Sequence, residues 1–214
     1  EINELDLEID ASRRGSLMHK LFELLLKDPK ILLWSKSSAL APSEMNARLE
    51  EYVERARIES QLELADEKFW PSMKTRTCEL ASRFLRSEFE IRGRFPKTET
   101  VAAELRVKGY IDLESFNLVS DKPSGPSLEF RGRIDRVDSD GCGNYVIYDY
   151  KSSKAGVSQY ASWIKNHELQ LLLYSIAIEN NLTALPPGHV TAALYYTTRP
   201  LGRDRSEERR VGKE

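Results

Sequence analysis

Residues 130–151, FRGRIDRVDSDGCGNYVIYDYK, decide the fold of this chain. Two strand-like runs, 128–137 and 145–151, flank a separator of Asp, Ser, Gly and Asn residues around Cys142. These residue types tolerate tight and left-handed turns, so the stretch predicts a β-hairpin whose turn centres on Cys142.

Two acidic residues of this hairpin, Asp135 and Asp149, lie at equal distances from Cys142 and are expected to face each other. Directly opposed Cβ atoms are about 4.5–5.5 Å apart, and like charges there repel. Lys151 follows Asp149 by two residues and shares its face, about 6.6 Å along the strand. A divalent cation between the carboxylates would turn the repulsion into binding. The alternative is an ordinary solvated hairpin face, and a register slip of one residue would separate the carboxylates.

Composition narrows the class of protein. The 214 residues include 40% hydrophobic and 31% charged side chains with a net charge of −2, which indicates a soluble globular protein with a substantial core. Any nucleic-acid contact must then be a local basic patch. Cys78 and Cys142 match no metal-binding spacing and are typical of reduced cytoplasmic thiols. No apolar run approaches the roughly 20 residues of a membrane span. The chain does not begin with Met, so we expect a fragment of a longer protein.

The first part of the chain has helical periodicity. Helices are predicted at about residues 13–27, 43–64 and 67–92. Ser12 is the expected N-cap of the first helix, and Pro71 is expected in the first turn of the third. His19 lies on the apolar face of the first helix, where a lone histidine is usually a satisfied core residue.

The remainder predicts a sheet. Strands are expected at residues 101–107, 109–116, 128–137, 145–151 and 190–197, and a helix at about 166–180. Lys108 and Gly109 are interpreted as a turn or bulge. Glu104 lies inside an expected strand and is either on its solvent-exposed face or part of a site. Gln170 and Tyr174 are four residues apart and share one face of the expected helix. The element order predicts an α/β fold: a mixed central β-sheet with an antiparallel meander, flanked by helices, plus an N-terminal helical portion.

Residues 205–214, RSEERRVGKE, are polar and lack apolar periodicity. The segment resembles the translation of a sequencing adapter, so our hypothesis is a non-native tail after Asp204. The alternative is an ordinary disordered tail.

Five short motifs occur along the chain in an order that indicates a family resemblance. They are GSLMH at 15–19, Glu104 in a strand, GRIDRVD at 132–138, DYKS at 149–152 and QLLLY at 170–174. Together they resemble the PD-(D/E)xK nuclease superfamily, and within it the RecB-type nuclease domain of the bacterial RecBCD and AddAB helicase–nucleases (AddB/RecB-like). The resemblance covers about Arg14 to Thr197. It implies a restriction-endonuclease-like core at about 98–197 and a helical portion at about 12–92, together one RecB-type nuclease domain within 1–204.

The resemblance also implies roles for individual residues. Asp135 and Asp149 match the metal-binding acids, and Lys151 matches the active-site lysine. His19 matches the histidine that completes the metal's ligands in the RecB-type branch. Glu104 is a further candidate ligand without a tight motif around it.

Two more residues match the QxxxY motif beside the site. We expect Gln170 to reach DNA and Tyr174 to pack behind Lys151 or to stack on a base. With the metal ligands, they complete the implied active site.

The implied activity is Mg²⁺- or Mn²⁺-dependent hydrolysis of DNA, as an exonuclease rather than an endonuclease, in end resection and recombinational repair in the bacterial cytoplasm. The expected partners are single- or double-stranded DNA ends and a helicase. Because no P-loop motif occurs in this chain, the helicase is expected in another domain of the full protein or in another subunit. No membrane is expected. AddB-type relatives add an iron–sulfur cluster whose cysteines flank the nuclease domain, beyond this fragment. Two alternatives stay open: a stand-alone or Cas4-like exonuclease, and an inactive DNA-binding scaffold, against which the intact Asp135, Asp149 and Lys151 argue.

Overall fold

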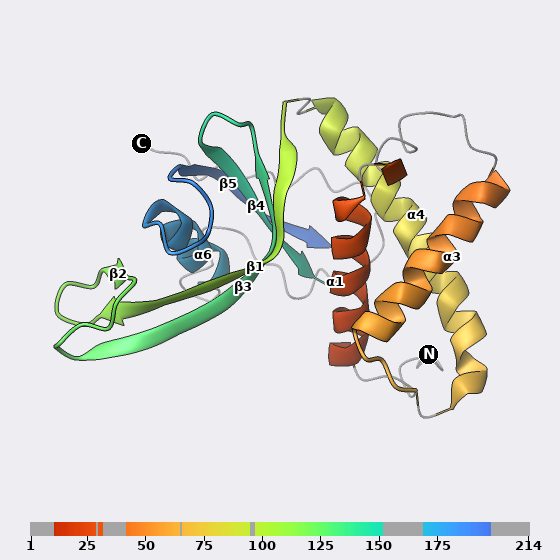
Figure 1. Ribbon diagram of the computed structural model, residues 1–214, viewed down its shortest axis with the longest axis horizontal. Helices are drawn as coiled ribbons and strands as arrows, with labels where there is room; N and C mark the ends of the chain where they lie inside the picture. The colour runs from red at the N-terminus through yellow and green to blue at the C-terminus, as the bar shows by residue number, and fades with distance from the viewer. Residues whose placement is uncertain are drawn as a thin grey trace. The chain divides into compact units, whose positions relative to one another are not determined.

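A computed structural model describes residues 11–28, 30–31, 42–64, 66–94, 97–151 and 169–197 (Figure 1). The chain divides into two compact units, Glu1–Pro96 and Lys97–Glu214. In the described part, the first unit is helical, and the second contains the sheet with one helix. The predicted tail at 205–214 and the predicted helix start at 166–168 lie outside the described residues.

The N-terminal unit is built from α1 (Ala11–Lys27), α3 (Pro42–Glu59) and α4 (Trp70–Arg94), with the 3-10 turn η2 (Glu67–Phe69) before α4. The apolar stripes of these helices pack on one another. The ring of Phe22 on α1 stacks on that of Phe84 on α4, with centroids 4.0 Å apart. Other buried side chains of this core are Leu17, Leu21, Leu25, Leu49, Val53, Ala56 and Leu85. No helix in the described residues is both long enough and apolar enough to cross a lipid bilayer.

The start of α1 differs from the prediction. The helix begins at Ala11, so Ser12 is not its N-cap. The Ser12 carbonyl accepts a hydrogen bond from Ser16 Oγ at 3.1 Å, which is an i to i−4 contact inside a helix. Pro71, in contrast, occupies the first turn of α4 as predicted, where its missing N–H leaves no intrahelical bond unmade.

The end of α3 also comes earlier than predicted, at Glu59 instead of residue 64. Gln61 adopts φ 53°, and the Leu62 N–H reaches back to the Arg57 carbonyl at 3.1 Å. This left-handed termination satisfies the last carbonyls of a helix and normally uses glycine. Sequence periodicity alone missed it because Gln61 is an unusual residue for that position.

The second unit is a five-stranded sheet in the order β2-β1-β3-β4-β5. The elements are β1 (Glu99–Asp112), β2 (Leu118–Val119), β3 (Ser127–Ser139), β4 (Asn144–Lys151), α6 (Gln170–Glu179) and β5 (His189–Thr197). Strands β1 to β4 pair antiparallel, and β5 pairs parallel with β4. The predicted α/β class, a mixed sheet with an antiparallel meander, is confirmed and is consistent with a restriction-endonuclease-like fold.

Helix α6 covers one face of this sheet and creates its core. Leu171 and Ala177 of α6 are fully buried, against Ile134 of β3 and Ile147 of β4. The helix is apolar on most of its surface, which agrees with its position over the sheet. The first residue of α6, Gln170, therefore lies where the strands of the hairpin meet the helix.

The predicted break at Lys108 and Gly109 is wrong, because both lie inside the continuous strand β1. They pair with Arg131 and Phe130 of β3. A Cβ at position 109 would lie 2.8 Å from the Val119 carbonyl oxygen. The glycine thus permits close approach of a neighbouring backbone and does not mark a turn.

Candidate active site

The β3–β4 hairpin has the register that the sequence predicts. The pairs run from Ser139↔Tyr145 to Arg136↔Tyr148, which centres the turn on Cys142. In the turn, the Cys142 and Asn144 N–H groups donate to the Asp140 carboxylate, at 2.8 and 3.2 Å. The side-chain hydrogen bond from Asn144 and these N–H groups lower the pKa of Asp140. The paired register ends at Arg136 and Tyr148, one residue short of Asp135 and Asp149, so the direct opposition of these two acids stays a prediction.

Both aspartates are almost completely buried, Asp135 at 5% and Asp149 at 3% exposure. Asp135 Oδ2 accepts the Tyr150 N–H at 2.6 Å. Asp149 Oδ2 lies 2.6 Å from Lys151 Nζ. Buried carboxylates are stable only with such donors or a cation. The predicted repulsion between the two acids is thus offset by a peptide N–H on one side and an ammonium on the other.

The alternation of side chains between the two faces of the sheet is shifted by one residue in β1 and in β3. Ile134 and Val137 of β3 both belong to the core beneath α6, although regular alternation would bring residues two apart to one face. On β1, Ala102 and Leu105 both pack against the same core. These residues pair across the strands, Leu105 with Ile134 and Ala102 with Val137. Each strand therefore accommodates one extra residue at the same level of the sheet.

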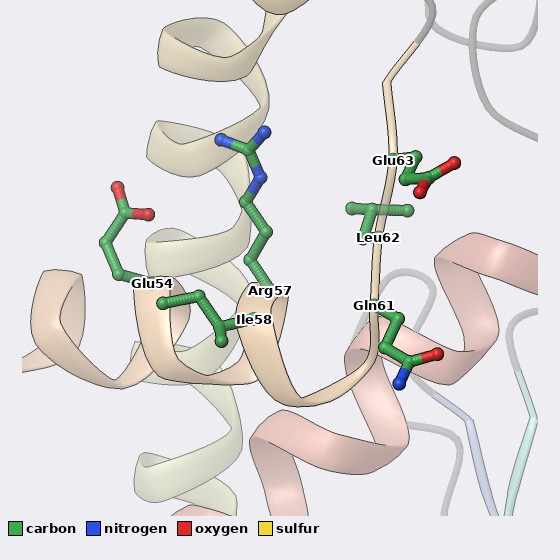
Figure 2. Close-up of a pocket in the computed structure, with 6 residues that line it drawn as sticks. All are labelled: Glu54, Arg57, Ile58, Gln61, Leu62 and Glu63. Atoms are coloured by element: carbon green, nitrogen blue, oxygen red, sulfur yellow. The ribbon is translucent and has the colours of Figure 1, made fainter.

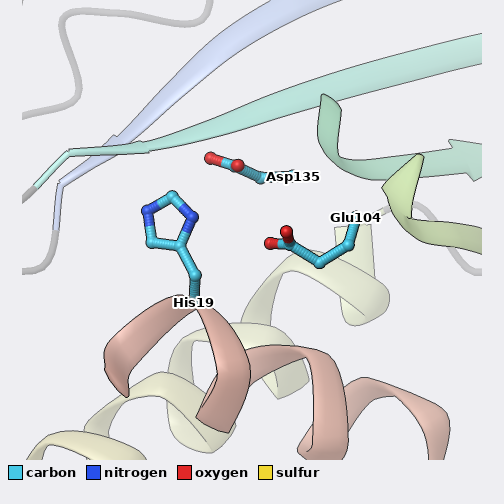
Figure 3. Close-up of side chains that lie close together, drawn as sticks. All are labelled: His19, Glu104 and Asp135. Carbon is cyan, nitrogen blue, oxygen red and sulfur yellow. The ribbon is translucent and has the colours of Figure 1, made fainter. Parts of the chain in front are cut away.

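Glu104 and Asp135 lie at this level. Glu104 adopts φ 57°, a left-handed conformation that costs a non-glycine residue roughly 1–2 kcal/mol. Carboxylate oxygens of Glu104 and Asp135 lie within 4.8 Å of one another (Figure 3). Glu104 Oε2 also pairs with Arg133 Nη1 at 3.0 Å. Two oxygen ligands on opposite sides of Mg²⁺ are about 4.2 Å apart, so the two carboxylates fit a small divalent cation.

Gln170 connects two predicted site residues. Its Nε2 donates to Asp149 Oδ1 at 2.7 Å, and its Oε1 accepts from Lys151 Nζ at 3.2 Å. Because an amide has one donating and one accepting end, a single side chain orients both charged groups. The expectation that Gln170 reaches DNA stays a prediction.

Tyr174 positions Gln170 through a hydrogen bond. Its hydroxyl oxygen accepts from Gln170 Nε2 at 3.2 Å and from the Arg133 N–H at 3.1 Å. The ring is buried over Gly132, where a Cβ would lie 2.5 Å from Tyr174 Cε1. Sequence reasoning assigned no role to Gly132. An isolated glycine inside a strand was the signal, because it indicates close approach of another group.

Asp138, the second acid of the GRIDRVD motif, is committed elsewhere. Its two carboxylate oxygens accept from Arg136 Nε and Nη2 at 2.7 and 2.6 Å, and both side chains are buried. The Arg136 guanidinium also lies over the Tyr148 ring, 4.5 Å from its centroid. A bidentate pair of this kind neutralises both charges, so Asp138 serves the fold and not a metal.

His19 lies on α1 of the N-terminal unit and is half-buried (Figure 3). Its assignment as a metal ligand stays a prediction that rests on the resemblance. Imidazole nitrogen together with carboxylate oxygen is a donor set that Mn²⁺ and Mg²⁺ accept.

The N-terminal unit also has a shallow pocket at the end of α3 (Figure 2). Glu54, Arg57, Ile58, Gln61, Leu62 and Glu63 line it. Arg57 is already engaged, because it pairs with Glu67 and lies over the Trp70 ring. The pocket contains no predicted site residue, and nothing in its lining indicates catalysis.

Comparison with known proteins gives one result on the family. No curated protein matches the chain significantly. A family model described as the PD-(D/E)XK nuclease superfamily matches residues 1–213. The match spans the buried aspartates, the lysine and the glutamine that the structure brings together, and the chain therefore belongs to the PD-(D/E)XK nuclease superfamily.

Proposed function

We propose that this chain is a metal-dependent deoxyribonuclease domain that hydrolyses DNA phosphodiesters. The observation that carries the proposal is a set of acids on neighbouring strands: the buried Asp135 has a carboxylate oxygen within 4.8 Å of one of Glu104, and the buried Asp149 pairs with Lys151. Burial of carboxylates is costly even when they have hydrogen-bond partners, so several of them at one site support a function in cation binding.

Glu104, Asp135 and Asp149 would hold the metal, and His19 is the further ligand that the resemblance implies. Carboxylates and one imidazole accommodate Mg²⁺ or Mn²⁺ and leave positions for water and a phosphate oxygen. When bound, the ion would polarise the phosphate, lower the pKa of an attacking water and neutralise the leaving oxygen.

The protein's own side chains would position the substrate and stabilise the transition state. Lys151 is 28% exposed at its side chain, so its ammonium can reach a phosphoryl oxygen while Gln170 keeps its direction. A positioned cation stabilises the charge that develops on the phosphoryl oxygens in the transition state. Gln170 is a positioning residue in this scheme, and Tyr174 fixes Gln170.

The biological setting is the more specific part of the proposal. We infer a RecB-type nuclease domain that acts with a helicase in end resection and recombinational repair, as an exonuclease. The order of the five sequence motifs, from His19 to Tyr174, supports this branch. A longer reading frame that also encodes helicase motifs, or a helicase that co-purifies with the protein, would be the expected finding. A short stand-alone gene would favour the alternative of a single-domain exonuclease.

Lys151→Ala tests the proposed chemistry. A lysine ammonium has no lone pair for a metal, so the variant should still bind Mn²⁺ and DNA within a few-fold of the wild type. Its single-turnover cleavage should fall by about 10²–10³. Lys122→Ala, an exposed loop variant of the same unit, should cleave normally. Near-normal cleavage by Lys151→Ala would contradict the assignment.

Metal dependence has its own test. Mg²⁺ or Mn²⁺ should raise the melting temperature of the wild type, because the ion binds the folded state alone. Asp149→Ala should abolish that rise. Linear and circular DNA, each with Mg²⁺, Mn²⁺ or a chelator, would show whether cleavage needs ends. An equal thermal shift in the wild type and the variant would exclude this metal site.

A further inference from the structure

The β1–β3 ribbon extends beyond α6 towards β2 (Figure 1). It carries basic residues that pair with each other across the two strands. Arg106 pairs with Arg133, and Lys108 pairs with Arg131, at successive positions on one face. All four residues are exposed. The residues between them, such as Val107, turn to the core under α6, so the basic side chains project from the opposite face.

The like charges that face each other across β1 and β3 destabilise this ribbon. Cβ atoms of directly paired residues are about 5 Å apart, and like charges there are destabilising. Glu129 relieves part of the repulsion through Arg131 Nη2 at 2.7 Å and Lys108 Nζ at 3.7 Å. The pairing of Glu104 with Arg133 relieves another part. Four cations still outnumber the three carboxylates on this face, Glu104, Glu129 and, at the end of β1, Asp112, in a chain whose net charge is −2.

The row of cations leads to the candidate active site. Arg133 precedes Asp135 by two residues on β3 and contacts Glu104 directly. At the other end of the row, Tyr110 follows Lys108 by two residues on the same face and is half-buried. The face thus presents an aromatic ring, two cation pairs and then the carboxylates, in that order.

We propose that this face of the ribbon binds the backbone of one single strand of DNA and guides it to the carboxylates. The inference rests on the proposed nuclease function and adds the path of the substrate. Successive cation pairs are about 6.8 Å apart along a strand, comparable to the spacing of phosphates in an extended single strand. Single-stranded DNA is commonly bound by cations that follow the backbone and an aromatic ring that stacks on a base, which is the role of Tyr110 here.

The test measures binding without cleavage. Fluorescence anisotropy with a labelled oligothymidine in EDTA, over a series of salt concentrations, would compare the wild type with Lys108→Gln/Arg131→Gln. Loss of two phosphate contacts lowers the slope of log K against log salt by about 1.4, and affinity should fall on the order of tenfold near 0.1 M salt. Glu129→Gln should have the opposite effect, tighter binding and a steeper slope, because it releases both cations.

The matched control is Arg55→Gln/Lys68→Gln. It removes the same charge from residues that are equally exposed, with side chains 58% and 68% accessible against 61% and 70% for Lys108 and Arg131. This control should bind with wild-type slope. The ribbon variant should melt close to the wild type, because the two ion pairs with Glu129 that it loses are exposed and contribute little to stability. Circular dichroism melts exclude misfolding as the cause.

Two failures are distinguishable. If wild-type protein binds the oligonucleotide with the expected slope but cleaves no DNA in Mg²⁺ or Mn²⁺, the nuclease proposal fails and the strand-binding face stands. If the wild type cleaves DNA while the ribbon variant keeps wild-type affinity and slope, the strand-binding face is refuted. Absence of any single-strand binding, equal losses in the control, or a loss confined to duplex DNA would also overturn it.

Discussion

Gly132→Ala is the sharpest probe of how the site is held together. The new Cβ would lie 2.5 Å from Tyr174 Cε1, 3.2 Å from Cζ and 3.0 Å from the hydroxyl. Ordinary contact begins near 3.4 Å, so the ring must retreat by about 0.9 Å. The Tyr174 hydroxyl is now 3.1 Å from the Arg133 N–H and 3.2 Å from Gln170 Nε2. Such a retreat would lengthen both contacts beyond hydrogen-bond range.

Overpacking of this kind costs about 1–3 kcal/mol, and each lost hydrogen bond adds about 1 kcal/mol. The total is about 3–5 kcal/mol, and a chain of this size loses about 2–4 °C in melting temperature per kcal/mol, so we expect a decrease of roughly 6–20 °C. Freed from Tyr174, Gln170 should orient Asp149 and Lys151 less well. We therefore expect kcat to fall about tenfold with little change in KM, because the loss is in positioning.

Thermal melts and single-turnover assays on one preparation would check both parts. Adding Tyr174→Leu to Gly132→Ala should restore part of the stability, since the clash is removed, but not the activity, since the hydroxyl is absent. Gly93→Ala is the matched control: a Cβ there has no neighbour within 4 Å, and alanine should stabilise the helix. A Gly132→Ala protein as stable and as active as the wild type would refute the reasoning.

Three other predictions concern single residues. Glu104→Gly should be about 1 kcal/mol more stable than Glu104→Ala in urea unfolding, because only glycine adopts the φ of 57° without strain. Both variants should lose metal-dependent cleavage, and equal stability of the two would contradict a strained backbone. Alkylation at pH 8 should reach exposed Cys142 before Cys78, since burial and then the nearby Glu50 raise the pKa of Cys78 to about 11, and peptide mass spectrometry would reveal a reversed order. His19→Ala should abolish most cleavage while the fold melts normally, if the imidazole ligates the metal; a lower melting temperature with normal activity per folded molecule would make it a core residue.

Local sequence patterns determined much of this protein. The turn residues around Cys142 set the hairpin register from Ser139 and Tyr145 to Arg136 and Tyr148, because antiparallel pairing follows directly from the turn centre. The spacing of Gln170 and Tyr174 places both on one side of α6 for the same reason of regular geometry. The mixed sheet also followed from the order of the elements.

Other features depended on contacts between distant segments. Gly109 looks like a turn residue in the sequence, yet it lies inside β1 because Val119 approaches its backbone. Likewise, nothing in the sequence around Gln170 indicates that its amide contacts Asp149 and Lys151. Helix packing on the sheet decided that.

Glu104 shows the difference best. Regular alternation predicts its face from its position in the strand, but β1 and β3 both slip by one residue at this level, and Glu104 takes a left-handed conformation. No local preference favours that conformation for glutamate. The many apolar contacts of the core with α6 on both sides of the slip outweigh a cost of roughly 1–2 kcal/mol and bring its carboxylate to within 4.8 Å of Asp135. The sequence determined which chemical groups are present and how the hairpin pairs, whereas the packing of the sheet against α6 decided where Glu104 points.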